Sequence, residues 1–425
     1  MRARTAFAVL ALAPGLAAQP PGDLLQRATA KVLDTVERLP RYLCTQTVDR
    51  QQYRADLARR GPSCEPDPHK KLTLMTTDRL RLDVAVSQQE MYSWVGESHF
   101  DDRGLFDLVR NGALQTGAFS SFLALIFRDD NSGFAFQGPV NEGGRALDRF
   151  DFRVPVSMSH YLFRGIGGRV TTGYYGHILV DPVTADLVRL EVHTEGLPPE
   201  TGACLSSTAL DYTRMRLNDA DFLLPARAEL FILDANGTEL KNTTVYSGCR
   251  EFMGESTLHF EAEPEPAAGP GGRPAAVELP AGLPFTVALT REIDPAVAAA
   301  GDRIPARLAG PIRDAQGQAL VPANTAVTVR ILQIRRFYVP VAALRLALRL
   351  ETVAVDGAPR PLLAEPDTSL PPPAPSRAGL PRRRNTAMAD NQDRHTVILD
   401  LVNLGGGLKV PTGFESKWFT AAIQP

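Results

Sequence analysis

The feature of this 425-residue chain that most constrains its fold is a hairpin pattern between residues 177 and 198. Asp181-Pro182 begins a turn, because proline presets φ at the second turn position and aspartate can bond its own backbone. After the turn, apolar and polar residues alternate in the order Val188, Arg189, Leu190, Glu191, Val192 and His193. A period of two with one apolar side predicts a half-buried antiparallel strand. We therefore expect an antiparallel sheet with this hairpin at its middle.

Runs with the same period continue on both sides of the hairpin, and Asn236-Gly237 between two of them is a strong hairpin signal. Helical spacing replaces the alternation in two places. Residues 105–127 fit two short helices broken at Gly117. The other helix is expected to be capped by Asp23 and to bury Leu25, Ala28, Val32, Val36 and Leu39. The pattern predicts a mainly β (α+β) fold: a curled antiparallel sheet or half-barrel with N-terminal and plug helices, plus a smaller C-terminal β-barrel.

Changes in composition suggest the domain boundaries. Residues 1–18 are expected to be a signal peptide, and residues 19–260 the half-barrel domain. Residues 261–276 are rich in Pro and Gly without periodicity, which predicts a linker. Alternating strands then resume, so residues 277–425 are expected to form the small β-barrel domain. Within it, the Pro cluster and Arg run of residues 365–396 predict a mobile loop.

The first residues have the order of a secretory signal peptide. Arg2 and Arg4 precede an apolar run over residues 6–16, which ends in the small residues Ala17-Ala18. The apolar run is too short to remain in a bilayer as a spanning helix. We expect cleavage after Ala18 and a periplasmic or secreted protein with no transmembrane segment after cleavage.

The four cysteines allow three pairings. Their spacing does not match the close pairs of a zinc site, and an exported chain favours disulfides. Sequence order favours two local bridges, because each would stay within one group of strands. The predicted bridges are Cys44–Cys64 and Cys204–Cys249.

No stretch of the sequence contains a motif that identifies a reaction. The formal net charge of −2 gives no global field for nucleic acid. No G-x-S-x-G elbow or H-E-x-x-H pair occurs, so we predict no enzyme, no catalytic residue and no cofactor. His177 and His193 flank the central turn and would make a metal site if Asp181 or Glu191 joined them. Polar residues on a solvated sheet face are the alternative, and we predict no metal site.

Aromatic residues are more suggestive, because three pairs are spaced two apart and each pair projects from one face of its strand. In a curled sheet, such pairs would line a concave apolar cleft that takes a hydrophobic ligand. In the alternative, they pack helices onto the sheet. The predicted ligand-binding residues are Tyr92, Trp94, Phe134, Phe136, Tyr161 and Phe163.

Three segments of the first domain also carry a family resemblance. They are the helix before RYLCTQTV, the run DRLRLDVAV followed by EMYSW, and GHILVDPVTADLVRLEVHTEGLP. With these, residues from about 23 to 263 resemble the LolA/LppX-like lipoprotein-carrier half-barrel superfamily. The resemblance implies an N-terminal helix, an open half-barrel plugged by a helix, and a concave face that holds lipid or a lipoprotein acyl chain.

The second domain carries a different resemblance. LPAGLPFTVALTREID is followed by AGDRIPARLAGPIRDAQGQALVPANTAVTVRI, which gives an opening strand, a G-D turn and a V-P-x-x-T turn. Residues from 278 to about 334 are similar to the β-barrel of TrbI-family conjugation and secretion proteins. The resemblance implies a small β-barrel with a role in the cell envelope.

Together these observations predict a non-enzymatic envelope protein that binds a lipid-like or apolar ligand in its first domain. A cell-envelope protein is a further expected partner, and nucleic acid is not. The alternative is a structural or protein-interaction module whose cleft is plugged by its own helices.

The signal peptide gives the first testable prediction. N-terminal sequencing of the exported protein should give a sequence that begins near Gln19, because the small residues before it suit the peptidase. A mature protein that retains Met1 would contradict the prediction.

Overall fold

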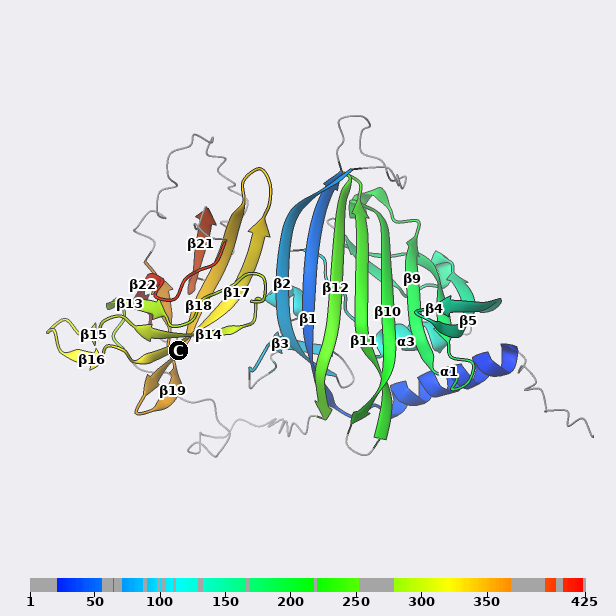
Figure 1. Cartoon of the computed structure of the whole chain (residues 1–425), viewed down its shortest axis with the longest axis horizontal. Coiled ribbons are helices and arrows are strands. Elements are labelled where there is room, and N and C mark those ends of the chain that lie inside the picture. The colour runs from blue at the N-terminus through cyan, green and yellow to red at the C-terminus, as the bar shows by residue number, and fades with distance from the viewer. Residues whose placement is uncertain are drawn as a thin grey trace, which may run out of the picture.

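The computed structural model of the chain describes residues 21–55, 64, 71–86, 90–97, 100, 104–109, 112–128, 133–165, 168–217, 220–251, 279–367, 394–402 and 408–422. The predicted signal peptide, the predicted linker and most of the predicted loop 365–396 lie outside these residues. Figure 1 shows two β-rich units side by side, which we call the N-terminal unit (residues 21–251) and the C-terminal unit (residues 279–422). The exact domain boundaries stay a prediction.

The N-terminal unit is built on one antiparallel sheet. In order of pairing, its strands are β4 (Ala135–Glu142), β5 (Arg145–Val154), β8 (Gly173–Val180), β9 (Leu187–Glu195), β10 (Ala203–Leu217), β11 (Ala220–Asp234), β12 (Thr238–Glu251), β1 (Tyr42–Ala55), β2 (Leu72–Val86) and β3 (Glu90–Trp94). The predicted central hairpin is β8–β9. The sheet curls without closing, so the predictions of a mainly β fold and of a half-barrel are confirmed.

The first helix, α1 (Pro21–Arg38), begins before Asp23, so the predicted cap at that residue is wrong. Its buried residues are Leu24, Ala28, Val32 and Thr35. The expected Leu25, Val36 and Leu39 are only partly buried. One ion pair joins the helix to the central turn: Lys31 Nζ lies 3.2 Å from Asp186 Oδ1.

Two short helices cover the concave face, as expected from residues 105–127. They are α2 (Leu105–Leu108) and α3 (Ser121–Phe127), with Gly117 between them. Figure 1 shows α3 behind the strands, on the side away from the viewer. Smaller elements complete the unit: η1 (Val156–Met158), β6 (Leu162–Gly165), β7 (Gly168–Thr171) and η2 (Pro199–Thr201).

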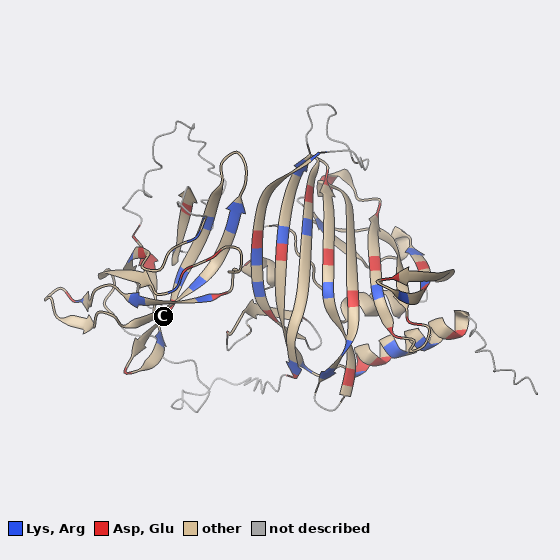
Figure 2. Cartoon of the chain, in the orientation of Figure 1, with Lys and Arg blue, Asp and Glu red and all other residues tan. Residues whose placement is uncertain are grey.

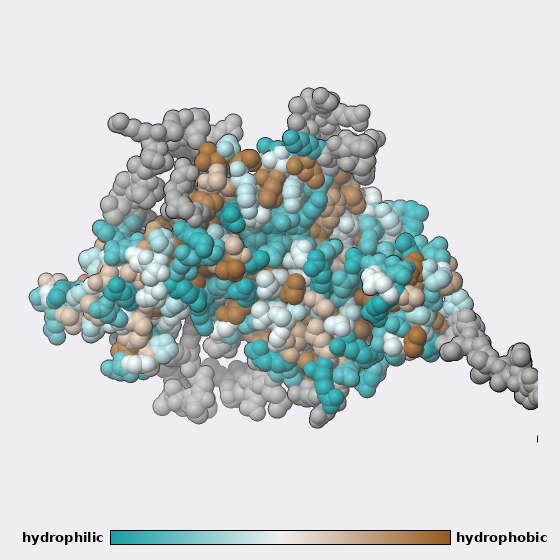
Figure 3. Space-filling view, viewed as in Figure 1, coloured by the Kyte–Doolittle hydropathy of each residue, from teal (hydrophilic) through white to brown (hydrophobic). Residues whose placement is uncertain are grey.

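The opposite side of the sheet, which we call the outer face, is solvated. Acidic and basic residues lie next to each other across its strands (Figure 2), and the surface in view is largely hydrophilic with separate apolar patches (Figure 3). Cross-strand ion pairs account for this pattern. Arg79 Nε lies 2.6 Å from Asp49 Oδ1, and Arg189 joins Asp211 at the same distance.

The C-terminal unit has a sheet and an apolar core of its own. Its strands are β13 (Pro284–Leu289), β14 (Arg303–Leu308), β15 (Ile312–Arg313), β16 (Ala319–Val321), β17 (Ala326–Phe337), β18 (Ala343–Val355), β19 (Ala358–Pro361), β20 (Ala364–Pro366), β21 (Thr396–Val402) and β22 (Glu415–Thr420). The main ladder runs β21–β18–β17–β14–β13–β22–β20. Its closure into a barrel and its kinship with TrbI-family proteins stay predictions.

The disulfides differ from the predicted local bridges. The observed bonds are Cys44–Cys249 and Cys64–Cys204. The first follows from the sheet, because β1 pairs with β12 and the two cysteines lie in that ladder beside its bulge. All four cysteines are oxidised, which is typical of a protein outside the cytoplasm.

The two units share a continuous sheet where β2 meets β17. Asp78 pairs in register with Arg335, and Tyr338 N donates to Met75 O at 3.0 Å. Residues 300 and 301 extend this contact, because Ala300 N donates to Arg79 O at 2.8 Å. We call the contact of β2 and β3 with β17 and residues 300–301 the junction.

Close approach at the junction requires glycine at position 301. Gly301 has a φ of +103°, and a Cβ there would lie 2.1 Å from Arg81 O. Its N–H donates to Ile331 O at 2.7 Å. The backbone of the C-terminal unit therefore lies directly against β2.

A fully buried arginine, Arg330, ties the junction together. It pairs with Glu351 and donates to Val95 O at 3.1 Å and Gly301 O at 2.7 Å. Arg303 donates to the same carboxylate at 2.8 Å and to Gly96 O at 2.8 Å. Burial alone would raise the pKa of Glu351, but the two arginines outweigh it and hold that pKa below its usual value. Glu351 therefore stays ionised and keeps both guanidiniums in place.

Removing Arg330 tests the junction. Arg330→Met should lower the free energy of unfolding by about 3 kcal/mol, because a largely buried carboxylate and two backbone carbonyls lose a donor. Urea unfolding measures the change. Arg227→Met is the matched control: its pair with Glu229 is 46% and 48% exposed, so the cost should stay below about 1 kcal/mol. Equal costs for the two variants would contradict the assigned role of Arg330.

Candidate functional site

The concave face of the N-terminal unit holds an aromatic cluster that α3 completes. The rings of Phe122 and Tyr161 lie 5.7 Å apart, and those of Phe127 and Phe134 lie 5.6 Å apart. Tyr161 also contacts Tyr174 at 5.6 Å. Two of the predicted ligand-binding residues, Phe134 and Tyr161, therefore meet the plug helix directly. Burial raises the pKa of Tyr161 to about 12, so its hydroxyl is neutral at physiological pH.

The other four predicted residues are spread over separate surroundings. Phe163 belongs to a second apolar cluster with Ala203, Leu230 and Ile232. Phe136 packs its ring 5.3 Å from Phe150 and is 41% exposed.

Tyr92 and Trp94 on β3 are buried away from the aromatic cluster. Tyr92 Oη donates to Glu90. Trp94 lies at the junction, where its ring borders the backbone of Gly301. The sequence could not separate these positions from the cleft, because period-two spacing reports the face of a strand and not what covers it. A ligand-binding role for any of the six residues stays a prediction.

A half-buried carboxylate, Glu90, organises the segment before α3. Glu90 accepts hydrogen bonds from Gly117 N at 2.7 Å and Phe119 N at 3.3 Å, in addition to Tyr92 Oη. Tyr212 Oη donates to Ala118 O at 3.0 Å. These bonds attach residues 117–119 to the sheet, and α3 begins directly after them.

Four tyrosines surround this carboxylate. Burial is the main reason that the pKa of each hydroxyl is raised, and the charge of Glu90 raises it further: Tyr42, Tyr92, Tyr212 and Tyr246. The rings of Phe119 and Tyr246 lie 5.0 Å apart, which places residues 117–119 inside the tyrosine group. Sequence reasoning missed Glu90, because a single acidic residue at the start of a strand carries no distinguishing pattern.

Among the described residues of the N-terminal unit, the hydroxyl of Tyr42 and the side-chain amide of Gln115 are buried without a hydrogen-bond partner. Buried polar atoms normally have partners, and a missing one costs about 1–3 kcal/mol.

His177 and His193 do approach one acid on the outer face. His193 Nε2 lies 2.8 Å from Glu191 Oε1, and His177 Nε2 lies 3.9 Å from Glu191 Oε2. Among the described residues, no group of three or more His, Cys, Asp or Glu side chains could hold a metal ion. The arrangement is a hydrogen-bonded histidine–carboxylate group on a sheet face.

Comparison with known proteins gives structural neighbours only. No protein-family model and no curated protein matches the chain. An outer membrane lipoprotein-sorting protein domain from Vibrio parahaemolyticus is similar with a TM-score of 0.28 and 9% identity, over 55% of this chain and 93% of that one. A DUF1329 family protein from Desulfovibrio piger has a TM-score of 0.26 and 10% identity, over 56% and 97%. A LolA superfamily protein from Nitrosomonas europaea has a TM-score of 0.23 and 10% identity, over 54% and 91%.

An N-terminal helix, an open curled sheet and a helix on its concave face are the features that the LolA/LppX resemblance predicts, and all three are present. No helix in the described ranges is long and apolar enough to cross a membrane.

Glu90 offers a direct test of this interior. Glu90→Gln should lower the free energy of unfolding by about 1–3 kcal/mol. The three hydrogen bonds need two acceptor oxygens, and a glutamine side chain has one oxygen and an NH₂ group that can only donate. Glu229→Gln on the outer face is the control, since Glu229 is 48% exposed and its loss should cost less than about 0.5 kcal/mol. Chemical denaturation measures both. A Glu90→Gln variant as stable as the control would show that the carboxylate does not hold residues 117–119.

Proposed function

We propose that the protein is a non-enzymatic cell-envelope protein, periplasmic or secreted, that binds a lipid-like or otherwise apolar molecule on the concave face of its N-terminal unit. The ligand would take the place of α3. The observation that carries the proposal is the contrast between this helix and the segment before it. Residues 117–119 are attached to the sheet by hydrogen bonds, whereas α3 contacts the sheet through the apolar residues Phe122, Leu123, Ile126 and Phe127.

The geometry gives α3 a defined pivot. Gly117 has a φ of +86° and lies between the attached segment and the helix. Phe122 N donates back to Gly117 O at 3.0 Å, so the helix starts from a tight turn. A helix of seven residues has little stability of its own, because isolated helices this short do not form in water. Its position depends on its apolar contacts.

The energies of plug and ligand are of similar size. Burying one large apolar side chain contributes about 1.5–3 kcal/mol, and four such side chains on α3 contribute roughly 6–12 kcal/mol. An acyl chain of about ten methylenes contributes about 8 kcal/mol at about 0.8 kcal/mol each. Because the two amounts are comparable, an apolar ligand can compete with α3 for the same surface.

The alternative function is a structural or protein-interaction module in which α3 stays in place permanently. The filled aromatic cluster and the sheet shared by the two units favour it. A cell-envelope protein would then be the partner. The two functions differ in what weakening α3 does to ligand affinity.

Leu123→Ala separates them. Leu123 is fully buried, so truncation weakens the plug and should raise the affinity for a fluorescent fatty acid at least tenfold, which corresponds to about 1.4 kcal/mol. Fluorescence titration of the full chain measures the change.

The control is Leu346→Ala in the core of the C-terminal unit, where the side chain is equally buried. This variant should lose stability by about 2–5 kcal/mol without a change in affinity. Saturable binding by neither the wild type nor Leu123→Ala would leave the structural module as the function of the protein.

A further inference from the structure

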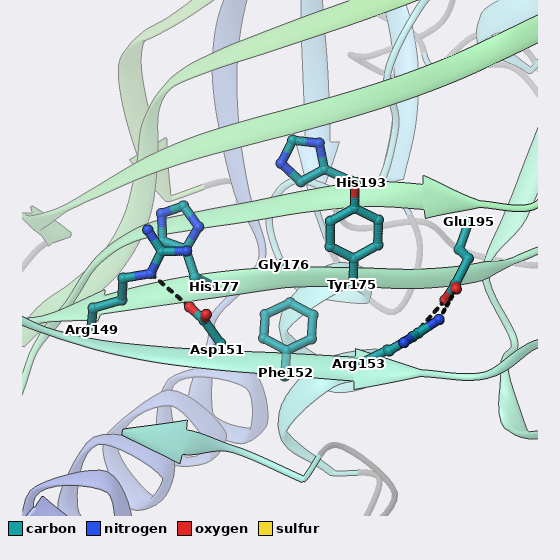
Figure 4. A pocket seen from close by; sticks show the side chains of 9 residues that line it. All are labelled: Arg149, Asp151, Phe152, Arg153, Tyr175, Gly176, His177, His193 and Glu195. Atoms are coloured by element: carbon teal, nitrogen blue, oxygen red, sulfur yellow. Dashed lines mark hydrogen bonds and ion pairs between the residues drawn. The ribbon is translucent and has the colours of Figure 1, made fainter. Parts of the chain in front are cut away.

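A groove of about 500 Å³ lies on the outer face, on the opposite side of the sheet from the proposed apolar site (Figure 4). Strands β5, β8 and β9 supply its lining. Two adjacent rungs of the sheet meet there: Asp151 pairs with His177, and Arg153 pairs with Tyr175, which in turn pairs with His193. The volume is within the range of small-molecule sites.

The charges in the groove are internally balanced. Arg149 Nε donates to Asp151 at 2.6 Å, and Arg153 Nε donates to Glu195 at 2.9 Å, at the two ends of the groove in Figure 4. Burial, with Arg149 next to it, lowers the pKa of His177, so this imidazole is neutral at pH 7. A groove without net charge has no field that selects a charged ligand.

Each of these pairs keeps hydrogen-bonding capacity for a ligand. A guanidinium has five N–H donors and a carboxylate about four acceptor sites, so one ion pair leaves most of them for other partners. Arg149 and Asp151 are 38% and 37% exposed. Donors and acceptors therefore alternate along an accessible surface, as a ligand with many hydroxyl groups requires.

The middle of the groove is aromatic. Tyr175 is 44% exposed, and His193 stacks on its ring at 5.1 Å with an interplanar angle of 14°. Glu191 Oε1 lies 2.8 Å from the Nε2 of this imidazole and accepts its hydrogen bond, which holds the ring in place. A rigid aromatic ring whose edge is exposed to water contributes apolar contact area with little loss of conformational entropy.

We propose that this groove binds a neutral saccharide. The apolar C–H face of a sugar ring would pack on Tyr175, while its hydroxyl groups exchange hydrogen bonds with the Arg149–Asp151 and Arg153–Glu195 pairs. This site is separate from the proposed apolar site, because Tyr175 and the charged lining residues lie on the outer face; Phe152 alone of the named lining side chains packs in the core. Its existence does not depend on the function proposed above.

The test uses the full chain on an array of neutral and acidic oligosaccharides, followed by calorimetric titration of the strongest neutral ligand. Tyr175→Ala should weaken binding at least tenfold, and Tyr175→Phe should retain it within about threefold, because the ring and not the hydroxyl makes the contact. Tyr53→Ala is the matched control: Tyr53 lies on β1, where Lys241 lies 5.1 Å above its ring, outside the groove. This control should bind as the wild type does.

Circular dichroism confirms that each variant is folded before titration. Absence of binding to every neutral oligosaccharide would overturn the proposal. So would binding that Tyr175→Ala leaves unchanged, or a preference for acidic sugars that disappears in high salt, since that would indicate recognition of charge. A fatty-acid titration of the same Tyr175→Ala sample should match the wild type, so failure of one proposed site is distinguishable from failure of the other.

Discussion

The structure depends on covering the concave face of an open sheet. Every second side chain of the curled sheet points to this side, and apolar residues there cannot remain in water without a large cost. The chain meets this requirement locally, with α1 across one part and α3 inserted among Phe134 and Tyr161. Because the cover is a short segment of the same chain, its strength is tunable by individual side chains. The same geometry therefore supports either a permanent plug or a displaceable one.

Carboxylates with several hydrogen-bond donors attach a loop and the other unit to this sheet. Glu90 attaches the segment before α3, and Asp78 accepts from Arg335 across the junction and from Arg50 on the neighbouring strand β1. Glu351 accepts hydrogen bonds from Arg330 and Arg303. Each carboxylate has several donors, which offsets the cost of removing it from water. Apolar contacts hold α3, whereas ionic hydrogen bonds fix the parts that surround it.

Local periodicity predicted the strands well, because the alternation of apolar and polar residues in a strand can be read from consecutive positions. The run from Leu344 to Leu350, which has a high helical propensity, forms β18 as its alternation predicts. Local periodicity does not predict which distant strands pair. The Cys44–Cys249 bond follows from β1 lying beside β12, and no local signal marks that contact. Trp94 was predicted to line the cleft. The sequence does not show that it is buried against Gly301, because that glycine lies more than two hundred residues away. The groove around Tyr175 was missed for a related reason, since its residues come from three strands and none forms a motif.

Strand β2 belongs to both units: one part pairs with β3 and another with β17. The backbone pairing of β2 with β17 therefore joins the two units directly, although the linker in the sequence suggests two independent domains. A chain divided at residues 261–276 would yield fragments that reassemble on each other, in the manner of a split protein.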